Sequence, residues 1–233
     1  IPGGSPANVA LTLGRLGRPV ALATWFGADT LGRLIDFHMN DSGVYITPAS
    51  RGASHTSTAL ARLDENGAAS YTFDLEWAPA APIEVPETAQ ILEAGSISAI
   101  IEPGASAVLD ALARGREHAL VFFDPNARPS IMGEPAVALV SLERFIALAD
   151  VVKVSDEDIE WLTGGAPIDK VVDRWLRMGP SLVVVTRGKH GSEVVTASGV
   201  RFTKTPSDVK VVDTVGAGDS FMGGMIDAMW GMG

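Results

Sequence analysis

Cysteine is absent from the 233 residues of this chain, which excludes several kinds of site at once. Without cysteine there is no disulfide, no thiolate nucleophile and no thiolate zinc site. A chain without cysteine is compatible with the cytoplasm, and we expect that location. The four histidines have no metal-ligand spacing, which favours structural or solvated roles for them. They are His38, His55, His118 and His190.

Positive charge is also scarce. Lysine and arginine number 18 against 28 aspartates and glutamates, so the formal net charge is −10. Such an acidic chain is a poor general binder of nucleic acid or anionic membranes, and we expect neither partner. No apolar run is long enough to span a bilayer. A nucleotide can still bind where helix ends and backbone N–H groups concentrate positive potential.

Apolar runs of strand length alternate with amphipathic stretches along most of the chain. Strands are predicted at residues 20–26, 91–97, 120–124, 151–154 and 182–186. Helices are predicted at residues 5–17, 30–43, 106–117, 134–148, 156–162, 168–178 and from 216 onward. Ser5 is the expected N-cap of the first helix. This order predicts a single α/β domain over residues 1–233, with a mainly parallel sheet covered by helices on both faces.

Two hairpins interrupt this rhythm. Residues 56–64 and 69–75 alternate in polarity and flank Glu65-Asn66-Gly67, a favourable hairpin turn. We interpret the region from about 44 to 76 as a small lid inserted in the domain, which closes over the substrate. A second hairpin is predicted at residues 194–196 and 200–203.

The segment DTVGAGDSF at residues 213–221 is the strongest chemical motif. Gly216 and Gly218 let the backbone pass close to a ligand, and the apolar stretch after them predicts the start of a helix. Unpaired N–H groups and the helix dipole make such a start an anion site. Asp219 would repel phosphate there unless it accepted a proton from an attacking hydroxyl. A glycine-rich turn capped by Asp219 is the alternative. A dinucleotide fingerprint fits poorly, because Phe221 stands in place of its third glycine.

A second motif, GGSPAN, occupies residues 3–8. Its glycine pair allows close backbone approach at a helix start. Asn8 can both donate and accept hydrogen bonds, which suits a sugar hydroxyl. A capped helix start without a ligand is the alternative interpretation of this motif alone.

The two motifs, in this order and at this separation, resemble the signatures of the ribokinase (PfkB) carbohydrate kinases. Three segments between them agree: GADTLG at 27–32, FDPNARP at 123–129 and TRGKHG at 186–191. Within the family, GSIS at 95–98, DPN at 124–126 and KVSDE at 153–157 look most like the fructokinase branch. The resemblance implies a ribokinase-like fold and ATP-dependent phosphorylation of a small sugar, with fructose favoured. A 2-keto-3-deoxygluconate or ribose kinase, and a catalytically silent sugar or nucleotide binder, are the alternatives.

The resemblance also implies roles for individual positions. Asp219 would activate the sugar hydroxyl as a base, while the N–H groups of Gly216, Ala217 and Gly218 would hold the transferring phosphoryl group. Substrate contacts are implied for Gly4, Asn8 and Arg128, and nucleotide contacts for Thr186, Gly188 and Gly191.

The implied cofactors are Mg²⁺ and, near Asp213, a monovalent cation such as K⁺. Asp158 stands where the family often has a glutamate linked to magnesium, and a solvated helix start is an equally good interpretation. Lids of this family often form dimer contacts, so a homodimer through the hairpin is a further expectation. The first strand and the last helices of the family are not found, and we expect elements to be missing from both ends.

Overall fold

The structure is a computed structural model that describes the chain except residues 64–68, 80–81, 207–213 and 232–233. Its centre is a six-stranded sheet with the strand order β12-β11-β10-β9-β8-β7. The four parallel strands are β7 (Ile91–Gly95), β8 (Leu120–Asp124), β9 (Val151–Ser155) and β10 (Leu182–Thr186). The antiparallel edge consists of β11 (Ser192–Thr196) and β12 (Arg201–Lys204). The predicted, mainly parallel sheet is thus confirmed.

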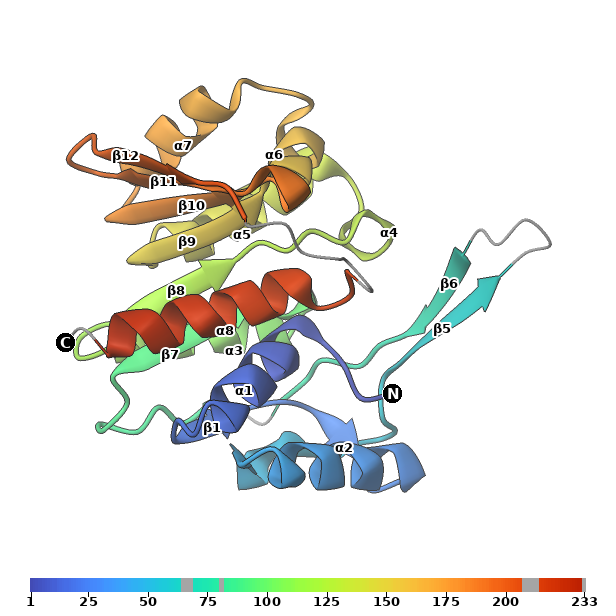
Figure 1. The fold of residues 1–233 in the computed structure, drawn as a ribbon. Coiled ribbons are helices and arrows are strands. Elements are labelled where there is room, and N and C mark those ends of the chain that lie inside the picture. The colour runs from blue at the N-terminus through green and yellow to red at the C-terminus, as the bar shows by residue number, and fades with distance from the viewer. Residues whose placement is uncertain (64–68, 80–81, 207–213, 232–233) are drawn as a thin grey trace.

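Helices cover both faces of this sheet (Figure 1). One face packs against α3 (Gly104–Gly115), α5 (Pro135–Ile146), α6 (Asp156–Thr163) and α7 (Ile168–Leu176). The other face packs against α1 (Ser5–Arg15) and α8 (Ala217–Trp230). Of the other described helices, α2 (Thr30–Asp41) packs against β1 and β3, and the short α4 (Pro129–Met132) contributes Met132 to the cluster under the first face.

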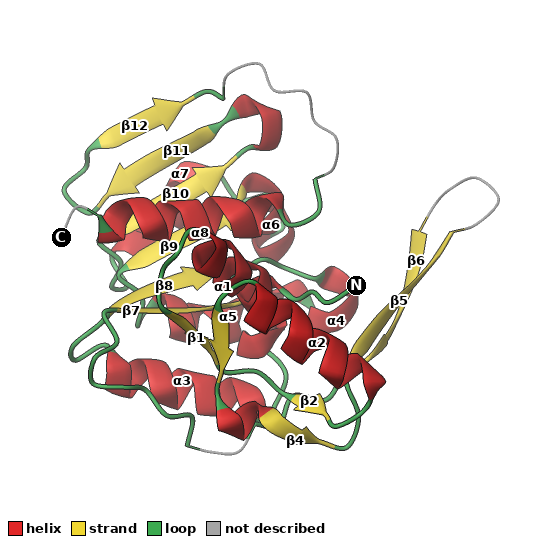
Figure 2. Cartoon of the chain, turned by 60° about the horizontal axis from the view of Figure 1, so that its bottom comes forward, coloured by secondary structure: helices red, strands yellow, loops and turns green. Residues whose placement is uncertain are grey.

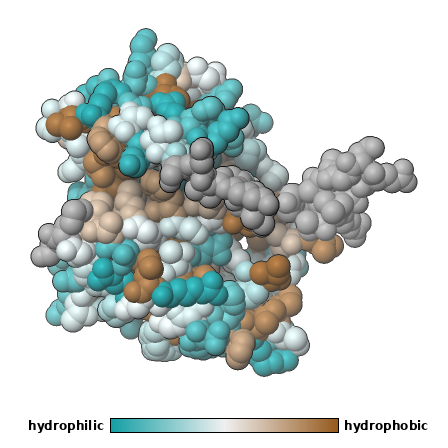
Figure 3. Space-filling view, in the orientation of Figure 1, coloured by the Kyte–Doolittle hydropathy of each residue, from teal (hydrophilic) through white to brown (hydrophobic). Residues whose placement is uncertain are grey.

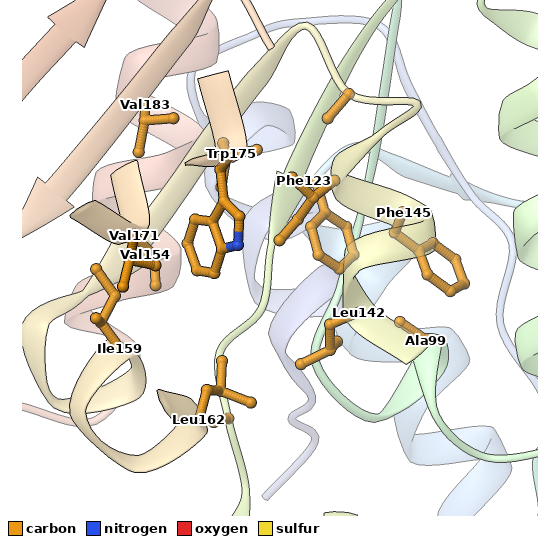
Figure 4. Close-up of a cluster of buried hydrophobic side chains, with 14 of the residues drawn as sticks. Ala99, Phe123, Leu142, Phe145, Val154, Ile159, Leu162, Val171, Trp175 and Val183 are labelled. Carbon is orange, nitrogen blue, oxygen red and sulfur yellow. The ribbon is translucent and has the colours of Figure 1, made fainter. Parts of the chain in front are cut away.

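The central strands are buried on both faces, which explains why their sequences are mainly apolar and do not alternate with polar residues. Phe122 and Val151 face α1 and α8, while Phe123 and Val152 point to the opposite face. On that opposite face the rings of Phe123 and Phe145 stack with centroids 5.4 Å apart, and Trp175 is fully buried beside them (Figure 4). Both sides of these strands are therefore sealed by helices, as in other parallel sheets.

The region of the predicted strand at residues 20–26 differs from expectation. It forms two short strands, β1 (Val20–Leu22) and β2 (Phe26–Gly27), which pair in parallel with β3 (Val44–Ile46) and β4 (Arg51–Ala53). Between them, residues 23–25 leave the strand pairing: Trp25 Nε1 donates to Glu76 at 3.0 Å, and the Thr24 N–H donates to Ser50 Oγ. The run of mainly apolar residues did not reveal this interruption of the strand, because the hydrogen-bond partners Ser50 and Glu76 lie far along the chain.

A cavity of about 1020 Å³ lies between the β1–β3 pair and the six-stranded sheet. Residues of both β1 and β7 line it, together with apolar side chains such as Val108 and Ile226. Among the described strands, β1 pairs with β3 alone and β7 with β8 alone. The cavity therefore separates two sheet edges that face one another.

The predicted hairpin forms an arm that projects from the body (Figure 1, Figure 2). Its strands β5 (Thr58–Leu63) and β6 (Ala69–Asp74) pair antiparallel, and the expected turn at 65–67 lies outside the described residues. The base of the arm is fixed by Asp29, the N-cap of α2, which accepts hydrogen bonds from Gly32 and from Thr56. These bonds lower the pKa of Asp29 to about 2. Strands β3 and β4, at the start of the expected lid range, belong instead to the body.

Apolar residues also reach the surface. A band of them crosses the face formed by α8 (Figure 3), where Phe221 is 39% exposed. Within the described part of the chain, no helix combines the length and apolarity needed to cross a membrane.

Candidate active site

Two helices of the same layer begin at glycines with left-handed backbones. Gly4 caps α1 with φ 116°, and Gly216 caps α8 with φ 73°. Side chains are disfavoured at such angles, which explains glycine at both positions. Ser5 was the predicted N-cap of the first helix, and this is wrong: Ser5 is the first helical residue, which frees its hydroxyl for another partner.

The helices α1 and α8 lie side by side (Figure 1), and a small residue at their contact lets them approach. A Cβ atom on Gly223 would lie 2.7 Å from Thr12 Cγ2, so glycine lets the two backbones approach. Val9 and Ile226 pack in the same buried cluster. This packing brings residues from the start and the end of the chain to one edge of the sheet.

Asp219 lies where the two helix starts meet, and it is 5% exposed. Its Oδ1 accepts hydrogen bonds from Ser5 Oγ at 2.7 Å and Asn126 Nδ2 at 3.1 Å. Its Oδ2 accepts from Asn8 Nδ2 at 2.8 Å. Asn126 Nδ2 also lies 2.7 Å from Ser5 Oγ, which completes the cluster. A carboxylate offers about four acceptor positions. Among the described residues the three donors occupy three of them and leave one, on Oδ2, for a further hydroxyl.

Sequence reasoning gave no chemical role to Ser5 or Asn126. Asn126 follows β8 with φ 36°, a left-handed conformation that asparagine tolerates better than most residues. Its N–H donates to Asp124 Oδ1 at 3.2 Å, and its carbonyl accepts from Ser96 Oγ. A polar residue directly after a buried parallel strand, at the carboxyl edge of the sheet, was the available signal.

The turn predicted to hold phosphate begins α8. The Ala217 N–H donates to the Thr214 carbonyl at 3.1 Å, so it closes the turn. The anion-binding roles of Gly216, Ala217 and Gly218 remain predictions. Asp213, the expected neighbour of a monovalent cation, lies outside the described residues.

The residues expected to contact nucleotide follow β10. Thr186 ends this strand, and Gly188 and Gly191 bracket a short turn with φ 49° and 95°. A Cβ atom on Gly191 would lie 2.0 Å from the Lys204 carbonyl, so glycine is required for this turn. Because β8 and β10 are parallel, the turn and Asn126 lie at the same edge of the sheet.

Arg128 and Asp158 have clear local partners. The Arg128 guanidinium donates to the Ala127 carbonyl at 2.8 Å, and the residue is exposed. Asp158 forms a capping box with Ser155 at the start of α6, and its Oδ1 also accepts from the Ala127 N–H at 2.9 Å. Asp158 thus ties α6 to the loop that carries Asn126. A link from Asp158 to magnesium, and a substrate contact by Arg128, remain predictions.

The large cavity beside β1 touches this carboxylate cluster at Ser5 and extends away from Asp219. Gly4 and Ser5 line it, but Asn8, Asn126 and Asp219 do not. We therefore place the candidate active site at the two helix starts rather than in this cavity. Among the described residues, no group of three or more histidine and acidic side chains could hold a metal ion.

The chain is similar to known proteins over nearly its whole length. The chain is 33% identical to a fructokinase of Rhizobium leguminosarum bv. trifolii, over 97% of this chain and 71% of that protein. It is similar to the structure of Vibrio cholerae O395 fructokinase with fructose, ADP and calcium ion bound, with a TM-score of 0.82 and 32% identity. That match covers 97% of this chain and 75% of the other.

A second solved structure is that of aminoimidazole riboside kinase from Salmonella enterica, with its riboside and an ATP analog. Here the TM-score is 0.81 and the identity 28%, over 97% of this chain and 75% of the other. The family described as pfkB family carbohydrate kinase matches residues 1–230. The chain belongs to the pfkB family of carbohydrate kinases.

Proposed function

We propose that this protein transfers the γ-phosphoryl group of ATP to a hydroxyl group of a ketohexose, with fructose as the best candidate. The observation that carries the proposal is the Asp219 carboxylate, which three donors hold at the start of α8 with one acceptor position left. A sugar hydroxyl at that position would give its proton to Asp219 as it attacks phosphorus. Relatives named fructokinase support a ketohexose as the acceptor. A cytoplasmic location is part of the proposal, because ATP is available there.

The helix start would supply the complementary part of the reaction. Phosphoryl transfer depends mainly on positioning and on stabilising charge over the phosphoryl oxygens. The N–H groups of Gly216 and Gly218, with the dipole of α8, would stabilise that charge. The base and the anion site come from one turn, so hydroxyl and phosphoryl would be held side by side. Gly4 and Asn8 would contact the sugar.

Magnesium would accompany the nucleotide. Mg²⁺ is commonly held by one or two carboxylates together with substrate phosphates and water, and it needs no cage made only of protein. The acidic start of α6, with Asp156, Glu157 and Asp158, fits that role and lies next to the Asn126 loop. Bound magnesium would neutralise phosphate charge. A potassium ion near Asp213 remains part of the proposal.

A substrate panel tests the proposed function. We expect the highest kcat/KM with ATP for fructose, when fructose, ribose, 2-keto-3-deoxygluconate and aminoimidazole riboside are compared in an ADP-release assay. Discrimination between such sugars depends on polar groups of the site that the wrong sugar leaves unpaired. Preference for a riboside would overturn the fructose assignment. Binding of ATP and sugar without turnover of any substrate would identify a silent binder.

The hairpin of β5 and β6 is proposed as a lid. Kinases exclude water so that ATP is not hydrolysed, and the arm is the described element that stands away from the body (Figure 2). We expect slower amide hydrogen exchange in residues 56–75 when fructose binds, with no change in α7 (Ile168–Leu176), a control helix that packs on the central sheet. Equal exchange in the hairpin with and without sugar would count against a lid.

The same arm is our proposed contact for a homodimer. Its strands present their backbone edges away from the body, and such edges readily pair with another chain. Light scattering on the intact protein and on a variant with a shortened hairpin would test this contact. A dimer that persists in the shortened variant would place the interface elsewhere.

A further inference from the structure

A lysine lies in the interior of the central sheet. Its neighbours Val151, Val152 and Val154 on β9 are all buried, and Lys153 itself is only 3% exposed. Burying an ammonium group is unfavourable unless the group is paired and hydrogen-bonded. The Lys153 Nζ donates to Asp124 Oδ2 at 2.7 Å, and Asp124 is completely buried at the end of β8.

Core stability does not account for this ion pair. Both charges lose their water, so a buried pair is often no more stable than apolar residues of similar volume. Burial raises the pKa of Asp124 to about 6 even with the Lys153 ammonium beside it. The position of the lysine offers a different reason.

Lys153 lies against the backbone of the turn that begins α8. A Cβ atom on Gly218 would lie 2.9 Å from Lys153 Nζ. Side chains alternate along a strand, and Val151, two residues earlier, packs with Met222 of α8. Lys153 therefore points to the same helix, and its ammonium group lies directly behind Gly218.

Negative charge accumulates in front of this turn. Asp219 follows Gly218 directly, and the N–H groups of this turn would hold the phosphoryl group during transfer. Two anions at one helix start repel each other, and the dipole of α8 supplies only about half a positive charge. A buried cation in contact with the turn offsets this repulsion, and low polarity around it strengthens its effect.

We propose that Lys153 is a positioning residue for phosphoryl transfer, whose fixed ammonium group seats the Gly218 end of the turn and balances the charge on its outer side. This inference rests on the proposed kinase function. Asp124 holds the ammonium group in place, and Lys153 acts through the backbone of Gly218.

The test compares the double variant Lys153→Met/Asp124→Asn with the intact protein. The double variant buries no charge, so its melting temperature should stay close to that of the intact protein. We expect kcat for fructose phosphorylation to fall roughly 100-fold, as on loss of one preorganised donor. The KM for fructose should change little, because Lys153 lies on the phosphoryl side. Val151→Ala on the same strand is the control: it lowers the melting temperature and leaves kcat unchanged.

Two results would overturn the inference. A double variant that folds and keeps its kcat would show that the pair only neutralises itself. A double variant that fails to fold would assign the pair to the core. If the intact protein phosphorylates no sugar, the proposed function fails, and the comparison of variants is not reached; activity of the intact protein therefore separates the two failures.

Discussion

Replacing Asp219 by asparagine is expected to lower kcat by about 10²–10⁴-fold, the usual effect of losing a general base. The substitution keeps the shape of the side chain and removes its basic oxygen. Oδ1 can still accept from Ser5 and Asn126, and the new amide can donate to Asn8 if the Asn8 amide turns its oxygen toward it. The pocket should therefore persist, and the KM values for sugar and ATP should change much less than kcat.

Steady-state kinetics with both substrates varied would check this expectation. Asp227→Asn is the matched control, because Asp227 lies on the same helix and pairs with Arg18, away from the carboxylate cluster. We expect the control to keep its kcat within about twofold, since its pair is partly exposed and such pairs contribute little. Loss of affinity with kcat retained in Asp219→Asn would make Asp219 a binding or capping residue.

The second large effect concerns stability and pH. Glu93 on β7 lines the large cavity, and its Oε1 is sealed from solvent without a hydrogen-bond partner among the described residues. Burial, reinforced by the nearby charges of Asp124 and Asp219, raises the pKa of Glu93 from 4.5 to about 8. The folded state therefore holds this proton more tightly than the unfolded chain does.

Stability should consequently fall as the pH rises from 4.5 toward 8, because the unfolded state releases the proton first. The full loss corresponds to roughly 4–5 kcal/mol. Glu93→Gln keeps a neutral side chain of the same shape, so it should match the intact protein near pH 5. Near pH 8 the variant should melt higher, by roughly 10 °C for a chain of this size.

Thermal unfolding of both proteins between pH 5 and 8.5 measures this difference. Asp124 also has a raised pKa, with a window that ends near pH 6, so the difference between the two proteins above pH 6 reports Glu93. Parallel melting curves across the whole range would show that the Glu93 carboxyl is hydrated or paired in solution.

Much of the fold was accessible from sequence because buried parallel strands are short, apolar and bounded. The predicted strands at 120–124 and 182–186 coincide with β8 and β10. The prediction failed at residues 20–26, where the break depends on Glu76 and Ser50, far along the chain. Local patterns do not contain partners of that kind.

Part of the site could also be predicted, because some of its residues belong to local sequence patterns. Asp219 and Asn8 belong to short motifs, and the structure brings them within 2.8 Å. Ser5 looked like a helix cap, because serine is common in that role, whereas here its hydroxyl donates to Asp219. Lys153 lay within a predicted strand, and only the register against β8 places it beside Asp124.

The packing of α1 against α8 also has a consequence for how the protein folds. Ser5 and Asp219 are 214 positions apart, so their hydrogen bond closes almost the longest loop in the chain. Contacts of such separation form slowly, since chain entropy must be lost before they stabilise anything. The central strands can pair earlier, with neighbours much nearer in sequence. Asp219 therefore acquires its three donors late on the folding pathway, and an intermediate with an intact sheet would still lack a positioned base.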